Sequence, residues 1–161
     1  MKKTLFLLLV FFVTLEAQAQ ALAIAKEFGN NLRKFALTDS IEYRDKVENL
    51  FNSNKGARIA DELVFVLVSH SVYPHHNSYE LDTYLNLIEK DSLDIEFSDF
   101  IEIENSLIES DTKTNEQKSR AEYVSCRLKV RGTVSLDTRD LIIIRNGRIT
   151  KIDKYPQTSQ Q

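Results

Sequence analysis

All three histidines of the chain, His70, His75 and His76, fall in one short stretch that could in principle bind a metal. Zinc is held at about 2 Å by imidazoles that converge with other ligands. His75 and His76 are adjacent and follow Pro74, and neighbouring side chains in such a loop need not converge. We therefore interpret the stretch as a solvated loop with a partly buried His70, and predict no metal site.

Cys126 is the single cysteine, so no intramolecular disulfide can form. It alternates with polar residues together with Val124, Leu128 and Val130, which predicts the apolar face of a strand. A buried cysteine behaves as a small hydrophobic residue. No basic partner that would make a reactive thiolate can be placed beside it. We expect Cys126 to line the core or a pocket and not to act as a nucleophile.

Carboxylates gather on one predicted strand and could do acid–base chemistry if burial raised the pKa of one of them. Most alternate with apolar residues, which indicates a solvated face. Asp99 is the exception, because it lies two residues from both Phe97 and Ile101 and is therefore expected on the same face of the strand as these apolar residues. Asp99 then either pairs with a donor in the core, lines a pocket, or marks the start of a strand at the sheet edge, and the last interpretation is favoured. The set comprises Glu96, Asp99, Glu102, Glu104 and Glu109.

Tyr43 and Tyr84 lie on apolar helical stripes, where the default role is core packing with the hydroxyl at the rim. In a pocket, these hydroxyls would orient a ligand. The chain has no G-x-S-x-G elbow, no P-loop and no G-x-G-x-x-G motif. No catalytic residue and no cofactor are therefore predicted, and the candidate pocket residues are Tyr43, Tyr84, Asp99 and Cys126.

Helical spacing of apolar residues predicts an amphipathic helix over residues 21–37 and a second helix that closes at Phe51. Asp39 is expected to cap the second helix, with Glu42 as its partner. Asn77 and Glu80 are expected to cap a later helix in the same way. The apolar stripe of that later helix consists of Leu81, Tyr84, Leu85 and Ile88.

Residues 59–70 fit two structures. Their apolar spacing suits a helix, yet residues 63–68 form one apolar run with three valines, which also suits a buried strand. The helix is favoured.

After Asp91 the apolar period changes to two, which predicts antiparallel strands. A first long strand is expected to place Phe97, Ile101, Ile103 and Leu107 on one face. A second is expected over residues 120–136, with a bulge or bend at Gly132. Asn146-Gly147 predicts a hairpin between residues 141–145 and 148–154, since both turn positions need positive φ. Helices followed by such strands predict an α+β fold, with the helices packed on one face of a curved sheet.

The chain begins with two lysines, an apolar run over residues 4–15 and the small-x-small sequence Ala17-Gln18-Ala19. This pattern is typical of a secretory signal peptide cleaved after Ala19, and the run is too short to span a bilayer. We expect residues 1–19 to be removed, residues 20–156 to form one domain, and residues 157–161 to be a disordered tail. The protein is then exported, to the periplasm or outside the cell, without a membrane span.

The formal net charge of −3 makes nucleic acid or an anionic membrane surface an unsuitable partner. One domain with a sizeable core is expected from the length.

The chain resembles the nuclear transport factor 2-like superfamily, the cone-shaped α+β fold shared with ketosteroid isomerase and polyketide cyclases. The resemblance covers residues 21–155 and rests on Leu37-Thr38-Asp39, on Glu48-Asn49-Leu50-Phe51 and on residues 140–153. It implies a short strand or hairpin before the helix that precedes the main sheet. It also implies a pocket between the helices and the concave face, which serves catalysis in some members and binding in others.

The favoured hypothesis is an exported non-catalytic binding module that recognises a small molecule or a partner protein. The alternative is a cofactor-independent isomerase, cyclase or hydrolase with a pocket acid, for which Asp99 is the candidate. A third hypothesis is a homodimer formed through the sheets, although polar Ser125, Arg127 and Lys129 oppose it for that strand.

Overall fold

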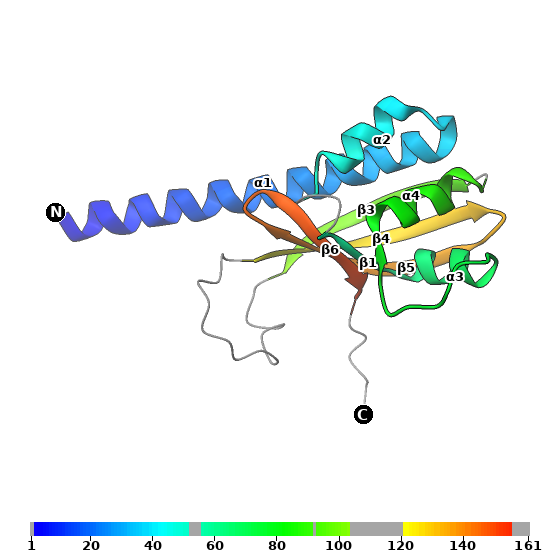
Figure 1. Ribbon diagram of the computed structural model, residues 1–161. Coiled ribbons are helices and arrows are strands. Elements are labelled where there is room, and N and C mark those ends of the chain that lie inside the picture. The colour runs from blue at the N-terminus through cyan, green and yellow to red at the C-terminus, as the bar shows by residue number, and fades with distance from the viewer. Residues whose placement is uncertain (1, 52–55, 92, 104–120, 156–161) are drawn as a thin grey trace.

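The computed structural model describes residues 2–51, 56–91, 93–103 and 121–155, with side chains from residue 19 onward. The fold is α+β, with helices packed on a six-stranded mixed sheet (Figure 1). The elements in chain order are α1 Lys2–Thr38, α2 Ile41–Glu48, β1 Arg58–Ala60, α3 Glu62–Ser69, β2 Tyr79–Glu80, α4 Leu81–Glu89, β3 Leu93–Ile103, β4 Glu122–Gly132, β5 Leu136–Arg145 and β6 Arg148–Lys154. Among the described residues, no helix has the length and apolar character needed to cross a membrane.

The sheet has the strand order β2-β1-β6-β5-β4-β3. All neighbouring strands are antiparallel except β1 and β6, which run parallel. The two-residue turn between β5 and β6 is confirmed, with φ of 51° at Asn146 and 67° at Gly147. Strand β3 lies at one edge of the sheet.

The core forms between the helices and one face of the sheet. The predicted stripe of α1 is confirmed, since Phe28, Leu32 and Phe35 are buried where α1 packs on β3 and β4. The predicted stripe of α4 is also confirmed, because all four of its residues are fully buried. From β4 the same core receives Val124, Cys126, Leu128 and Val130.

The alternative of a buried strand over residues 63–68 is wrong, because these residues lie within a helix. The favoured helix is confirmed as α3, and the short strand β1 precedes it. Asp61 separates the two elements and caps α3, because its Oδ1 accepts a hydrogen bond of 2.8 Å from the Val64 N–H.

Both predicted capping pairs are wrong. Asp39 adopts a left-handed φ of 50° and donates its N–H to Phe35 O at 2.8 Å, so it ends α1 and leaves Ser40 as the N-cap of α2. At the later helix, the N-cap is Glu80 and not Asn77. Glu80 pairs with Arg58 in the β1–β2 ladder, and this extended conformation delays the helix to Leu81.

The predicted face of the first long strand is wrong after Phe97. A bulge shifts the β3–β4 register between Ser98 and Ile101, and Asp99 within it has φ of 50°. The extra residue reverses the alternation. Phe100 consequently packs against the core, and Ile101 is 53% exposed. Leu107, Glu104 and Glu109 lie outside the described residues, as does the predicted tail.

The predicted strand over residues 120–136 is two strands. Strand β4 ends at Gly132, whose φ of 138° is accessible to glycine, and β5 begins at Leu136. The expected bend at Gly132 is therefore present as a reversal of the chain at the end of β4, and the alternative of a bulge within one strand is wrong.

Candidate functional site

The four predicted pocket residues do not meet in one place. Tyr84 and Cys126 are buried in the core, whereas Asp99 is exposed in the β3 bulge. Tyr43 is half-buried on α2, with Lys34 Nζ and Lys46 Nζ at 5.2 and 4.9 Å from its ring centroid. The hypothesis that Asp99 is a core acid is therefore wrong. The favoured interpretation, a strand start at the sheet edge, is wrong, because Asp99 lies in the middle of the edge strand β3. Asp99 does line the cavity described below.

Tyr84 and Cys126 border two buried acids that the sequence analysis missed. Asp61 and Asp140 are each 0% exposed. Asp140 lies opposite Cys126 in the β4–β5 register, and both carboxylates act electrostatically on Tyr84 and Cys126. The parity of Asp140 with the buried Ile142 and Ile144 was a signal in the sequence for its inward position.

Burial dominates the ionisation of this interior cluster. Burial and repulsion from Asp61 raise the pKa of Asp140 to about 9, against a smaller opposing effect from Thr138. Burial raises the pKa of Asp61 to about 6, and the Val64 N–H opposes that increase. Burial likewise raises the pKa of the Tyr84 hydroxyl and of the Cys126 thiol. The cluster therefore retains a proton at neutral pH, and Cys126 is an inert thiol.

Three polar atoms of the cluster have no hydrogen-bond partner among the described residues. They are Asp61 Oδ2, Asp140 Oδ2 and the Tyr84 hydroxyl. The Tyr84 hydroxyl lies near Asp61 and lowers the pKa of that carboxyl, but the two groups do not meet the geometry of a hydrogen bond. An unsatisfied buried polar group costs about 1–3 kcal/mol, so this cluster is not explained by stability.

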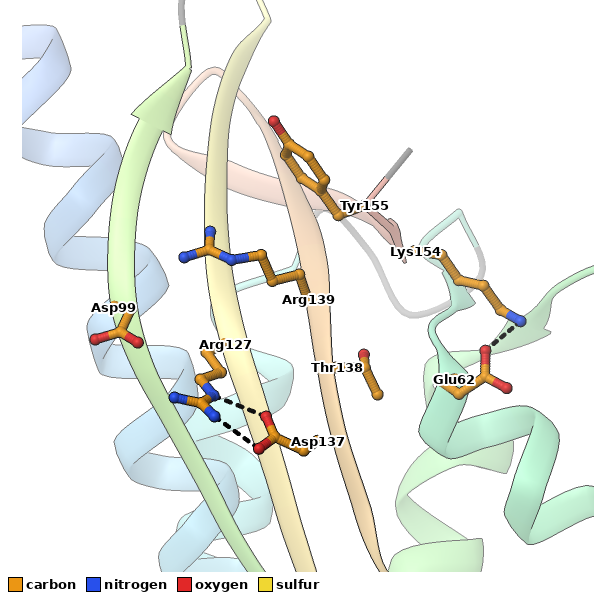
Figure 2. A pocket seen from close by; sticks show the side chains of 8 residues that line it. All are labelled: Glu62, Asp99, Arg127, Asp137, Thr138, Arg139, Lys154 and Tyr155. Carbon is orange, nitrogen blue, oxygen red and sulfur yellow. Dashed lines mark hydrogen bonds and ion pairs between the residues drawn. The ribbon is translucent and has the colours of Figure 1, made fainter. Parts of the chain in front are cut away.

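A cavity of about 840 Å³ lies on the sheet face that points away from α1 (Figure 2). This volume is within the usual range for small-molecule sites, about 300–1,000 Å³. Strands β3, β4 and β5 form its floor, and α3 and the end of β6 form one side. Its lining consists of Glu62, Asp99, Arg127, Asp137, Thr138, Arg139, Lys154 and Tyr155.

Two ion pairs within the lining neutralise four of its charges. Arg127 donates from Nε and Nη2 to the two carboxylate oxygens of Asp137, each at 2.7 Å. Lys154 pairs with Glu62 at the α3 side, and its ammonium group lies 4.7 Å from the centroid of the Phe65 ring.

Arg139 is differently placed. It lies opposite Arg127 in the β4–β5 register, and its Nη1 donates to the Ser125 hydroxyl at 2.7 Å. Within the described part of the chain, Arg139 forms no ion pair with a carboxylate. A guanidinium held by one neutral hydroxyl keeps several donors free to bind a carboxylate or phosphate.

The pocket and the buried cluster share a wall. The Thr138 side chain lines the pocket, and its hydroxyl donates to Asp140 Oδ1 at 3.4 Å. Glu62, also in the lining, directly follows Asp61 in the chain. Neither acid lines the pocket itself, so Thr138 is the polar connection between the two sites.

The histidines do not form a site. His70, His75 and His76 are all exposed, so the expected partial burial of His70 is wrong. His70 lies at the C-cap of α3, where its Nδ1 is 2.9 Å from Val66 O, and this end of the helix faces solvent. No group of metal-ligating side chains suited to an ion occurs in the ranges that the structure describes.

No protein-family model matches the chain, and no curated protein matches it.

Proposed function

We propose that this chain is an exported, non-catalytic binding module that recognises a small molecule bearing an anionic group in the sheet-face pocket. The observation that carries the proposal is Arg139. Its guanidinium lines a ligand-sized cavity and has a neutral hydroxyl as its partner, whereas Arg127 in the same cavity is occupied by Asp137. A carboxylate ligand would complete the charge-assisted hydrogen bonds that Arg139 lacks.

A titration tests this role. Calorimetry of the protein with acetate, succinate and benzoate should give saturable binding for at least one of them, and Arg139→Gln should weaken that binding at least tenfold. Arg148→Gln is the matched control, because Arg148 is an exposed arginine in the β5–β6 turn region and does not line the pocket. Equal affinity of the Arg139→Gln variant and the wild-type protein would contradict the proposal.

Export is part of the same proposal and rests on the signal-like residues 1–19. Cleavage after Ala19 would leave Ala21, Ala25 and Phe28 and thus the buried stripe of α1 intact, because the side chains of Ala19 and Gln20 are exposed. Intact mass of the protein recovered from the periplasm or medium should correspond to a chain that begins at Gln20. Recovery of the full-length chain from the cytoplasm would contradict export.

We also propose the nuclear transport factor 2-like cone as the fold. Its expected early hairpin has a counterpart in β1 and β2, which pair with each other before α4. The binding site proposed here differs from the pocket expected for that family. Buried side chains such as Tyr84 and Leu85 fill the centre of the space between the helices and the sheet, and a smaller cavity of about 470 Å³ lies at its end, beside α1, α4, β3 and β4. The cavity of the proposed site lies on the opposite face of the sheet.

An acid–base enzyme is the second candidate, and Asp140 is the observation in its favour. The raised pKa of Asp140 suits proton transfer near neutral pH. Its carboxyl does not line the pocket, however, and the connection between them is the hydrogen bond from the Thr138 hydroxyl. Nuclear magnetic resonance of each bound ligand over time distinguishes the candidates. Conversion by the wild-type protein and none by Asp140→Asn would support catalysis, and unchanged ligand would support binding alone.

A further inference from the structure

Asp99 and Arg139 are the two charged residues of the pocket lining that lack an ion-pair partner within the described residues, and they have opposite signs. The remaining charged groups of the lining are paired as Arg127 with Asp137 and Lys154 with Glu62. A complementary ligand would therefore need both a negative and a positive group.

The two unpaired groups lie along one row of the sheet. Ser98 on β3, Arg127 on β4 and Arg139 on β5 are register partners, and Asp99 directly follows Ser98. Figure 2 shows the Arg139 side chain extending across β4 toward β3, where Asp99 lies. The hydrogen bond from Arg139 to Ser125 holds the guanidinium over β4. Strands lie about 4.8 Å apart, so the two charges are separated by about one to two strand spacings, or roughly 5–10 Å.

Charge is distributed unevenly along this row. Asp137 raises the pKa of Arg127 most strongly, and Asp99 and Glu96 add to that increase from β3. Two carboxylates on β3 and one on β5 thus act on the Arg127 guanidinium. The guanidinium of Arg139 lies over β4 and is bound by the neutral Ser125 hydroxyl. The β3 edge of the pocket is therefore negative, and Arg139 is the positive group that faces it.

We propose that the ligand is a small zwitterion, whose carboxylate binds Arg139 and whose ammonium group binds Asp99. This inference rests on the proposed binding function and adds the class of ligand. The two charges of an amino acid or a related amino-carboxylate of a few carbons would span the row. A simple anion would satisfy Arg139 and leave Asp99 without a partner.

The conformation of Asp99 makes a clean variant possible. Its φ of 50° lies in the left-handed region, which asparagine adopts about as readily as aspartate. Asp99→Asn therefore removes the charge and preserves the bulge. Asp45→Asn on the exposed surface of α2 is the matched control for loss of one carboxylate outside the pocket.

The experiment compares γ-aminobutyrate with butyrate and butylamine, which share its carbon chain but each lack one charge. Calorimetry at neutral pH should show γ-aminobutyrate binding at least tenfold more tightly than either analogue. Asp99→Asn should weaken binding of γ-aminobutyrate and abolish its advantage over butyrate, whereas butyrate should bind at least as tightly as it does to the wild-type protein, because the lining loses one negative charge. Arg139→Gln should abolish binding of both carboxylates, and Asp45→Asn should behave as the wild-type protein.

The outcomes separate this inference from the function on which it rests. Equal affinity for butyrate and γ-aminobutyrate, dependent on Arg139 and independent of Asp99, would overturn the zwitterion and leave the anion-binding module standing. Absence of binding by both carboxylates would overturn the inference, and the acetate, succinate and benzoate titrations then decide separately on the binding module. Unfolding curves for each variant establish that lost binding does not reflect a lost fold.

Discussion

Arg127 and Asp137 are joined across β4 and β5 by two parallel hydrogen bonds of 2.7 Å, from Nε to Oδ1 and from Nη2 to Oδ2. This geometry lowers the pKa of Asp137 and fixes the Arg127 side chain. It also determines which arginine is available for a ligand. Asp137 occupies Arg127, and the neighbouring Arg139 is left for a ligand.

Replacement of Asp137 should therefore release a second arginine into the pocket. We expect Asp137→Asn to strengthen carboxylate binding several-fold, because the lining gains one unit of positive charge. The urea midpoint should change little, since the ion pair is exposed to solvent. Calorimetry with succinate, compared with the wild-type protein at equal ionic strength, measures the effect. Unchanged or weaker binding would show that Arg127 does not face the ligand.

Asp140 should make stability depend on pH. Its folded pKa is raised to about 9, so the folded state holds a proton that the unfolded chain releases near pH 4. The contribution of Asp140 to stability should then be fully present below the unfolded pKa and be lost as the pH rises through about 9. Between about pH 5 and pH 9, the decline should be on the order of a few kcal/mol.

The Asp140→Asn variant isolates this effect. It should reduce the decline in the free energy of unfolding, measured by urea denaturation across the pH range. Asp45→Asn, on the exposed surface of α2, should retain the decline of the wild-type protein. A wild-type stability that is constant from pH 5 to pH 9 would refute a buried, protonated Asp140.

Gly29 should not tolerate a side chain. A Cβ at this position would lie 2.8 Å from Phe97 Cβ and 3.3 Å from Phe100 Cζ, and the Phe97 atom cannot move without its strand. Gly29→Ala gains about 1 kcal/mol of helix propensity, but the overpacking costs about 1–3 kcal/mol. We expect net destabilisation in urea, whereas Asn30→Ala on the exposed side of α1 should be neutral or stabilising. A stabilised Gly29→Ala variant would mean that α1 and β3 are less closely packed.

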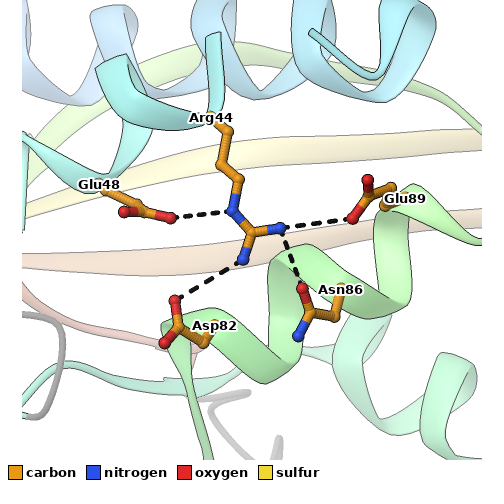
Figure 3. Close-up of polar contacts among 5 residues, drawn as sticks. All are labelled: Arg44, Glu48, Asp82, Asn86 and Glu89. Atoms are coloured by element: carbon orange, nitrogen blue, oxygen red, sulfur yellow. Dashed lines mark hydrogen bonds and ion pairs between the residues drawn. The ribbon is translucent and has the colours of Figure 1, made fainter. Parts of the chain in front are cut away.

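Arg44 connects α2 to α4 (Figure 3). It donates to Glu48 on its own helix and to Asn86 across the interface, at 3.0 and 2.9 Å, and it pairs with Asp82 and Glu89. The side chain is 19% exposed, so these contacts are partly shielded from water. Arg44→Gln should cost about 1–3 kcal/mol of stability, because three carboxylates lose their common partner.

The exposed pair of Lys46 with Glu42 provides the control for Arg44. Lys46→Gln should leave the thermal midpoint nearly unchanged, since exposed pairs within one helix contribute little. Equal effects of the two substitutions would show that Arg44 acts as an ordinary surface charge and does not fix α2 to α4.

Local patterns predicted the elements whose signals lie within a few residues. The stripe of Phe28, Leu32 and Phe35 predicted the buried face of α1, and Asn146-Gly147 predicted the final hairpin. Cys126 was correctly placed on a core face from the alternation around it. The predicted N-caps at Asp39 and Asn77 were wrong. Asp39 ends the preceding helix, and the pairing of Glu80 with Arg58 between two strands delays the start of the later helix.

The candidate site was predicted poorly because its residues become neighbours only through the alignment of separate strands in the sheet. Arg127 and Arg139 come together only once β4 and β5 are aligned, and Asp99 joins them because of a bulge that reverses the parity of β3. Asp61 and Asp140 are likewise far apart in the chain. The sequence can show that Asp140 alternates in step with buried residues and that Asp61 precedes a helix. It cannot show that the two carboxylates lie close enough to repel each other.

The sequence by itself determined the α+β class, the apolar stripes of the helices and the final turn, since each depends on contacts between near neighbours. The tertiary structure decided which polar residues became buried, which face received a pocket and which arginine was left without a carboxylate. These outcomes depend on strand register and on the β3 bulge. A shift of one residue in either would move every following side chain to the other face of the sheet.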